Sequence, residues 1–284
     1  MFRMRPALIL LLLASLTLFG CDKSKEISLA KAKEHVEALA KAATQDVAEV
    51  KNGLPAGAKY LVPLYQKEQK PADDLSAVRE ALDRARGKVQ DLRVAKSTFF
   101  ALVADDGTVL RNDQEQDRMA GKNAFKAFPE LKQALSGKYL ETRGSMLEAA
   151  GVNGPDGQWI AAAPVVVDGK TRGLYVSGWS WSSYAYRLET AARGQAKSEV
   201  MNAGSKKEPL LYVYVVVDDA AYGAPVSPEV NAKAILAEKP LEHAQGDAVF
   251  AKTVDITGRD FGLAVKRVPA LGKDVAIAVL RSET

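Results

Sequence analysis

The feature that most restricts the fold of this chain is an order of elements that occurs twice. Residues 99–104 are apolar and rich in aromatic side chains, and a turn of sequence Asp105-Asp106-Gly107 follows them. A second apolar run, residues 210–217, also ends in two aspartates, Asp218 and Asp219. After each run come a short helical pattern and further segments typical of antiparallel strands. The sequence therefore predicts an α+β chain with two similar units built on antiparallel sheets.

Two long helical patterns precede the first of these runs. Within residues 29–50, apolar side chains recur every three or four positions, and Asn52-Gly53-Leu54-Pro55 is expected to end this helix. The same spacing between residues 75 and 92 predicts a second helix. The two apolar stripes most simply pack on each other or on a sheet, while a coiled-coil dimer has thinner support. Residues 29–96 are therefore predicted to be a helical region that begins with a helical pair.

Residues 97–192 are predicted to form the first sheet domain. Its clearest element is a hairpin of residues 159–167 and 171–181, joined by the turn Asp168-Gly169. Pro164 within the first strand favours a sheet edge or a bulge there, because proline cannot donate a ladder hydrogen bond.

The C-terminal part of the chain is expected to repeat this pattern on a smaller scale. Residues 193–208 are predicted to be a linker that follows a helix. A short helix over 227–237 is indicated by Ser227 at its N-cap and proline at its first position. Residues 209–284 are therefore predicted to be a second, truncated unit of the same kind.

The N-terminal residues predict export. Arg3 and Arg5 precede an unbroken apolar run, residues 7–19. This run is shorter than the roughly 20 residues that a membrane-spanning helix needs. Residues 1–20 are therefore expected to be a cleavable signal peptide.

The apolar run ends in Leu18-Phe19-Gly20-Cys21, which resembles the lipobox of bacterial lipoproteins. Cys21 is thus the expected site of lipid attachment, and residues 21–28 are expected to be a polar tether. The alternative is a signal peptide with an incidental cysteine. Because Cys21 is the only cysteine, an internal disulfide is excluded. Asp22 resembles a retention signal of enteric bacteria and gives a weak lean toward the inner membrane.

The charge balance excludes one class of partner. The formal net charge of +4 falls to +2 when Arg3 and Arg5 are removed with the signal peptide. Such a nearly neutral chain lacks the basic stripe of a nucleic-acid-binding protein. Its 47% hydrophobic content is typical of a globular protein.

Three segments of the first domain follow one another in an order that resembles a known family. Each motif alone is common, and their order and spacing carry the resemblance. They are Phe100-Ala101-Leu102-Val103-Ala104-Asp105-Asp106-Gly107-Thr108-Val109-Leu110, then Phe128-Pro129-Glu130-Leu131 to Ala134-Leu135-Ser136-Gly137, and finally Ile160-Ala161-Ala162-Ala163-Pro164-Val165 with Gly173-Leu174-Tyr175-Val176. Together they resemble the Cache domain, an extracytoplasmic relative of the PAS fold, and residues 209–282 resemble it more loosely.

The resemblance implies a curved antiparallel sheet flanked by helices, with a small-molecule pocket over one face of the sheet. Members of the family usually bind amino acids, carboxylates or amines outside the membrane of receptors. Those that bind amines and amino acids carry an acidic residue near the end of the last strand. That place falls near Gly178 here, which favours an anionic or neutral metabolite. Because no membrane-spanning helix or output domain follows, a signal is expected to pass through a separate membrane signalling protein.

Enzyme signatures are absent from the sequence, so we expect neither catalysis nor a cofactor. His35 is expected to be solvated or half-packed and His243 to lie in a loop, and neither has partners at zinc-ligand spacing. Asp113, Glu115 and Asp117 alternate, but they lack the glycine and distal glutamate of a calcium loop. They are interpreted as a solvated turn.

The candidate ligand-binding residues are Arg143, Trp159, Trp179, Trp181 and Tyr184. Alternation predicts that Trp179 and Trp181 lie on one face of a strand. Aromatic side chains with polar tips suit a pocket for a small ligand, but core packing against the N-terminal helices is the favoured alternative. Arg143 is the candidate to bind a carboxylate, with an ordinary surface arginine as its alternative.

These observations predict an extracytoplasmic lipoprotein, anchored in a membrane by its lipid, that binds a small metabolite and acts through a separate membrane partner. The alternative is a structural or interaction lipoprotein of the cell envelope whose sheet units bind no ligand. A cavity connected to solvent favours the first function, whereas a cavity filled by side chains favours the second.

Overall fold

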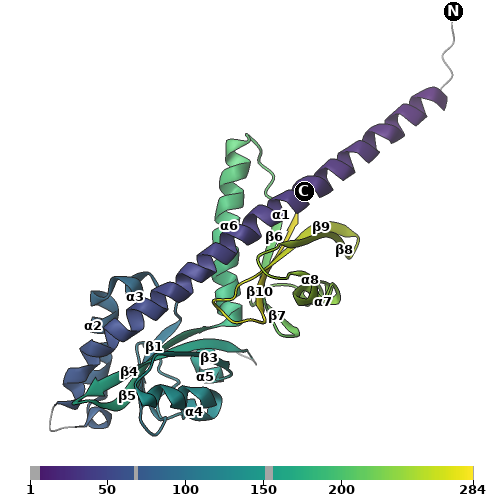
Figure 1. The fold of residues 1–284 in the computed structure, drawn as a ribbon. Coiled ribbons are helices and arrows are strands. Elements are labelled where there is room, and N and C mark those ends of the chain that lie inside the picture. The colour runs from purple at the N-terminus through teal and green to yellow at the C-terminus, as the bar shows by residue number, and fades with distance from the viewer. Residues whose placement is uncertain (1–6, 67–69, 151–155, 284) are drawn as a thin grey trace, which may run out of the picture. The chain divides into compact units, whose positions relative to one another are not determined.

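The computed structural model describes residues 7–66, 70–150 and 156–283 of the chain. By their contacts they divide into two compact units (Figure 1). The first unit is Ala42–Tyr184, and the second unit comprises Met1–Lys41 and Ala185–Thr284. Each unit contains one five-stranded antiparallel sheet, as the repeated order in the sequence predicted.

The N-terminal helix α1 (Ala7–Ala58) contributes to both units. It is longer than predicted, because it continues through Pro55 instead of ending at Asn52. Packing explains the difference: Leu54 is fully buried, and Gly57 lies so close to the Tyr175 ring that a Cβ there would be 2.6 Å from its Cε1 atom. Burial of this last turn outweighs the cost of proline in the helix interior.

Residues 21–28, which were predicted to be a polar tether, continue α1 in the structure. The reason is local: Ser28 is buried, and its hydroxyl donates to the Ser24 carbonyl and accepts from the Glu283 N–H. Lys25 also forms an ion pair with Asp260 at 3.1 Å. The predicted lipidation site, Cys21, lies in α1, but its side chain is outside the described part of the structure.

The first sheet has the strand order β2-β1-β5-β4-β3 and is antiparallel throughout. Its strands are β1 (Phe99–Ala104), β2 (Val109–Asn112), β3 (Leu140–Gly144), β4 (Gln158–Val167) and β5 (Lys170–Ser180). The hairpin of β4 and β5 confirms the prediction, since Asp168 and Gly169 both have positive φ angles suited to a tight two-residue turn. Pro164 lies beyond the part of β4 that pairs with β3, next to a register shift at Val165. It is thus at an edge and beside a bulge, as expected.

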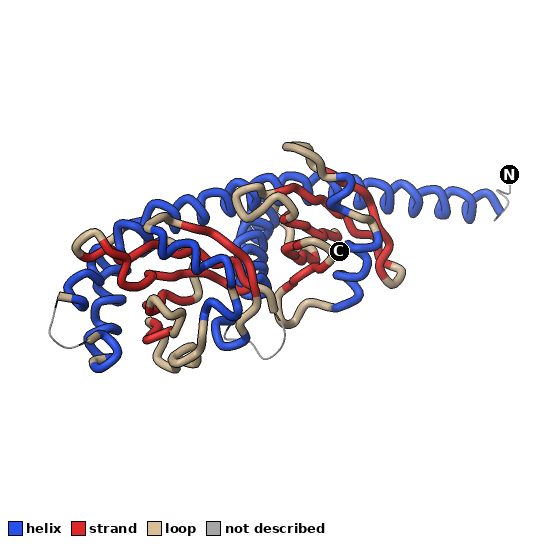
Figure 2. The backbone as a smooth tube through the Cα atoms, turned by 60° about the horizontal axis from the view of Figure 1, so that its bottom comes forward, coloured by secondary structure: helices blue, strands red, loops and turns tan. Residues whose placement is uncertain are grey.

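Helices and loops cover both faces of this sheet (Figure 2). One face, here called the helix face, carries Phe100, Tyr175 and Trp179, and it packs against α1 and the segments that follow it. Those segments are η1 (Lys59–Tyr65), η2 (Pro71–Asp73), α2 (Leu75–Lys88) and α3 (Gln90–Val94). The predicted second helix is therefore divided at Val89, whose backbone is extended.

The opposite face, here called the loop face, is covered by the chain between β2 and β4. That chain forms α4 (Ala124–Ala127), η3 (Pro129–Ser136) and α5 (Leu147–Ala150). As predicted, the short helix η3 ends at Gly137, which has a left-handed conformation. Buried Phe128 and Leu131 from this layer pack against Ile160 and Val176 of the sheet.

The second sheet has the order β7-β6-β10-β9-β8, which repeats the arrangement of the first. Its strands are β6 (Leu210–Val217), β7 (Ala220–Gly223), β8 (Phe250–Ile256), β9 (Arg259–Arg267) and β10 (Val275–Ser282). Five strands in the same order correct the prediction that this unit is truncated. Two short helices, α7 (Glu229–Ala237) and α8 (Pro240–His243), pack on one face through Ile235 and the adjoining Ala244. His243 ends α8 and does not lie in a loop.

Helix α6 (Trp181–Asn202) joins the two sheets along the chain. It includes residues 193–202, which were predicted to be part of a linker. The apolar spacing of three and four continues there, because Ala192 and Ala196 are both buried. Between α6 and β6, residues 203–209 lie outside helices and strands.

Within the described parts of the chain, no helix has both the length and the apolar composition that crossing a membrane requires.

Candidate ligand-binding site

A cavity of about 270 Å³ lies at the loop face of the first sheet, where β1 begins and β2 ends. Phe99 and Ala149 provide its apolar part, and both belong to the buried core of the loop face. The other lining residues are all polar or charged. They are Thr98, Asn112, Gln114, Glu115, Gln116, Arg118 and Glu148.

Two buried carboxylates hold the loop that lines this cavity. Asp113 accepts a 2.8 Å hydrogen bond from the Phe100 N–H and a 2.9 Å hydrogen bond from Arg86. Asp117 accepts hydrogen bonds from the backbone N–H groups of Asn112, Met119 and Ala120. Through these hydrogen bonds, Asp113 and Asp117 fix the backbone conformation of the loop between them.

These contacts correct the interpretation of the acidic cluster as a solvated turn. The side chains of Asp113 and Asp117 are only 2% and 1% exposed, whereas Glu115 is exposed. Burial raises the pKa of Asp113, and the Phe100 N–H and the Arg86 guanidinium oppose this effect. Alternate acidic residues thus have different roles: two organise the loop and one lines the cavity.

The charged groups at the cavity are of both signs. Glu148 forms an ion pair with Lys122 at 3.1 Å, so that its charge is partly balanced. Glu115 and Arg118 are exposed on the loop. Among the residues that the structure describes, no group of His, Cys, Asp and Glu side chains could hold a metal ion. The site is therefore suited to a small polar molecule bound by amide, carboxylate and guanidinium groups.

The aromatic residues proposed from sequence come together, but they fill the helix face. Trp159 stacks on Trp179 with ring centroids 4.3 Å apart, and Trp179 stacks on Tyr184 at 4.7 Å. All three are at most 1% exposed. The Tyr184 hydroxyl donates a 2.8 Å hydrogen bond to Asp46 of α1. This is the packing of a core, which was the favoured alternative.

Trp181 and Arg143 are not at the cavity either. Trp181 is the first residue of α6, so the prediction that it shares a strand face with Trp179 is wrong. Arg143 lies directly opposite Trp159 in the pairing of β3 with β4 and therefore belongs to the helix face. None of the five predicted ligand-binding residues lines the cavity. The sequence signal for the site was the polar run after β2, from Asn112 to Arg118.

The sequence has glycine at position 178, near the place where the resemblance implies an acidic residue, and the geometry of the sheet explains this glycine. Gly178 pairs with Phe99 in β1 and Ile160 in β4, both of the loop face. A Cβ at this position would be 2.3 Å from the carbonyl oxygen of Trp159. A side chain at this position would therefore have to displace the strand beside it, which explains why glycine and not an acidic residue is found here.

Solved structures of sensor domains have the same arrangement of elements. A domain of a sensory box/GGDEF family protein from Vibrio parahaemolyticus aligns over 92% of this chain and 98% of its own, with a TM-score of 0.59 and 10% identity. The chain has a Cache-like fold. The ligand-binding domain of the Campylobacter jejuni chemoreceptor Tlp3, in complex with L-norvaline, aligns over 92% of both chains with a TM-score of 0.53 and 12% identity.

The sensor domain of the histidine kinase DctB from V. cholerae also aligns, over 88% of this chain and 95% of its own, with a TM-score of 0.50 and 13% identity. No protein-family model and no curated protein matches the sequence. At such low identities the Cache-like fold is shared, while binding residues have to be derived from this chain itself.

Proposed function

We propose that this chain is an envelope lipoprotein whose first unit binds a small polar metabolite and which acts through a separate membrane protein. The observation that carries the proposal is the cavity on the loop face, with its mixed polar lining. The lipid anchor at Cys21 is part of the proposal and rests on the N-terminal sequence.

The cavity narrows the class of ligand. Its volume of about 270 Å³ is slightly below the 300–1,000 Å³ of pockets for drug-sized molecules. Two glutamates and one arginine are among the lining residues, so a purely anionic ligand would meet repulsion. The lining therefore favours a small neutral or zwitterionic molecule over the anionic one that the sequence had left open.

A binding screen with a matched pair of variants tests this function. The purified protein is screened against neutral, zwitterionic and anionic metabolites by thermal shift, and hits are measured by calorimetry. Arg118→Ala, which alters the cavity lining, is expected to weaken binding by about tenfold or more, since a charge-assisted hydrogen bond contributes roughly 1.5–3 kcal/mol.

Arg172→Ala is the control, because Arg172 is exposed on β5 and does not line the cavity. Equal weakening by both substitutions would remove the cavity as the site. Hits that bind both variants like the parent protein would have the same consequence.

One observation favours the second candidate, a structural or interaction lipoprotein. The centre of the loop face is occupied by buried apolar side chains, including Met119, Phe128 and Leu131. If no metabolite in the screen shifts the melting temperature, and Gln116→Trp in the cavity alters neither stability nor envelope phenotype, the scaffold function is the better account.

A further inference from the structure

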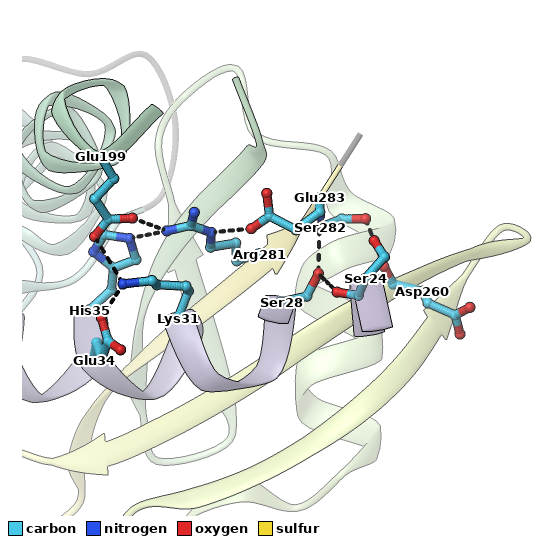
Figure 3. A network of polar contacts seen from close by, with 10 residues as sticks. All are labelled: Ser24, Ser28, Lys31, Glu34, His35, Glu199, Asp260, Arg281, Ser282 and Glu283. Atoms are coloured by element: carbon cyan, nitrogen blue, oxygen red, sulfur yellow. Dashed lines mark hydrogen bonds and ion pairs between the residues drawn. The ribbon is translucent and has the colours of Figure 1, made fainter. Parts of the chain in front are cut away.

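A buried histidine in the second unit touches an arginine directly (Figure 3). His35 of α1 is 2% exposed, and its Nε2 atom lies 2.6 Å from Nη1 of Arg281 near the end of β10. The same Nη1 atom donates a 3.0 Å hydrogen bond to Glu199 of α6. One guanidinium nitrogen thus connects the helix α1, the helix α6 and the strand β10.

The protonation state of His35 follows from this contact. An arginine side chain can only donate hydrogen bonds, so Nε2 of His35 has to be the acceptor and carries no proton. The imidazole is then neutral, with its proton on Nδ1. Burial and the Arg281 charge both lower the pKa of His35, and Glu199 and a hydrogen bond with Gln195 oppose them in part.

The charged groups around His35 come from every element packed against it. Arg281 and Glu199 face it from β10 and α6, and Lys31 lies one turn away on α1. Glu199 lies 3.7 Å from Lys31, and Glu283 pairs with Arg281 at 2.8 Å. Glu199 and Glu283 are therefore already engaged by Arg281 and Lys31, which weakens the stabilisation that Glu199 can give to an imidazolium.

We propose that His35, Arg281 and Glu199 form a pH-sensitive latch, which holds the ends of β10 and α6 on α1 while His35 is neutral and releases them when it is protonated. A proton on Nε2 turns the acceptor into a donor and places two positive charges 2.6 Å apart. The hydrogen bond is then lost and replaced by repulsion in a buried place, where charges are weakly screened.

The direction of the pH effect is fixed by the lowered pKa. The unfolded chain binds a proton on His35 near the ordinary value of 6.5, before the folded chain does. The contribution of His35 to the stability of the second unit is therefore complete above about pH 6.5 and is lost as the pH falls toward the lower pKa of the folded chain.

The titration of His35 gives a direct test. It is followed by NMR in the full chain, whose two histidines are assigned separately. His35 is expected to titrate below the ordinary value of 6.5. A midpoint of His35 at or above 6.5 would overturn the proposal.

Variants test the consequence for the fold. The melting temperature of the parent protein is expected to fall by several degrees more between pH 7.5 and pH 5 than that of His35→Gln, which keeps an acceptor for Arg281 and cannot be protonated. His243→Gln should behave like the parent protein. If the melting temperature falls equally between pH 7.5 and pH 5 in all three proteins, His35 does not control the latch.

A local readout distinguishes release of the latch from general loosening. Backbone amide exchange of Ser282 and Glu283, corrected for its intrinsic pH dependence, should accelerate at pH 5 in the parent protein and in His243→Gln. Unchanged protection of these amides at pH 5 would contradict the proposal even if His35→Gln failed to fold.

Discussion

Of the two buried carboxylates that hold the loop at the cavity, Asp117 accepts the larger number of backbone hydrogen bonds. It accepts three backbone hydrogen bonds and lies 3.5 Å from the Arg111 guanidinium. A loop residue normally leaves its backbone N–H groups to water, but here they converge on one side chain. The shape of the cavity rim is therefore a property of this residue as much as of the residues that line it.

Asp117→Ala is expected to lower the free energy of unfolding of the first unit by about 1–3 kcal/mol, because buried N–H groups lose their acceptor. Urea denaturation measures the loss. Glu115→Ala, two residues away and exposed, should change stability by no more than about 0.5 kcal/mol. Similar losses in the two variants would contradict the structural role of Asp117.

The two tyrosines at the start of α6 provide a second comparison. Tyr184→Phe removes the hydrogen bond to Asp46 within the aromatic stack, at an expected cost of about 1.5–3 kcal/mol for a bond to a charged group. Tyr186→Phe should be nearly neutral, since Tyr186 is 54% exposed. Thermal unfolding of both variants checks this. A stable Tyr184→Phe protein with weakened ligand binding would return the aromatic stack to the list of candidate sites.

At the scale of elements, the close approach of β4 and β5 depends on Gly178. Gly178→Ala is expected to destabilise the sheet by about 1–3 kcal/mol, because a Cβ would overlap the Trp159 carbonyl oxygen. Gly194→Ala is the control with the opposite sign: this position in α6 is open, and alanine should stabilise the helix by about 0.5–1 kcal/mol. Chemical denaturation measures the free energy of unfolding, which should fall in Gly178→Ala and rise in Gly194→Ala.

The elements themselves could largely be predicted from sequence, and the reasons are local. Alternation and turn chemistry correctly indicated β4, β5 and their hairpin, because each signal lies within a few residues. The end of α1 could not be predicted, since contacts of Leu54 and Gly57 with distant parts of the first unit decide it.

The candidate site could not be predicted for a related reason. The sequence indicated that Arg143 and Trp159 lie on neighbouring strands of the first sheet, but it does not say which face of the sheet the helices cover. The polar run Asn112–Arg118 carried the signal for the cavity, yet its buried carboxylates have the same sequence pattern as a solvated turn. Burial of His35 was missed likewise, because its partner Arg281 is 246 residues away in sequence.

At the scale of the whole molecule, the proposed anchor makes a prediction about location. Cys21→Ala is expected to move the protein from the membrane fraction to the soluble fraction, or to leave it unprocessed. Ser24→Ala, in the same helix, is the control and should stay in the membrane fraction. Fractionation and metabolic labelling with a fatty acid measure both effects. Labelling that persists in Cys21→Ala would show that the lipid is attached elsewhere.

The hydrogen bond between Glu283 and Ser28 has a practical consequence for engineering. Because the Glu283 N–H and the Ser28 hydroxyl are in contact, a short peptide can connect residue 283 to residue 28. New termini can then be opened in the exposed segment 203–209, outside helices and strands. We expect such a circular permutant to fold with the same circular dichroism spectrum. A fluorescent protein fused after β10 would in turn lie beside Ser28 of α1.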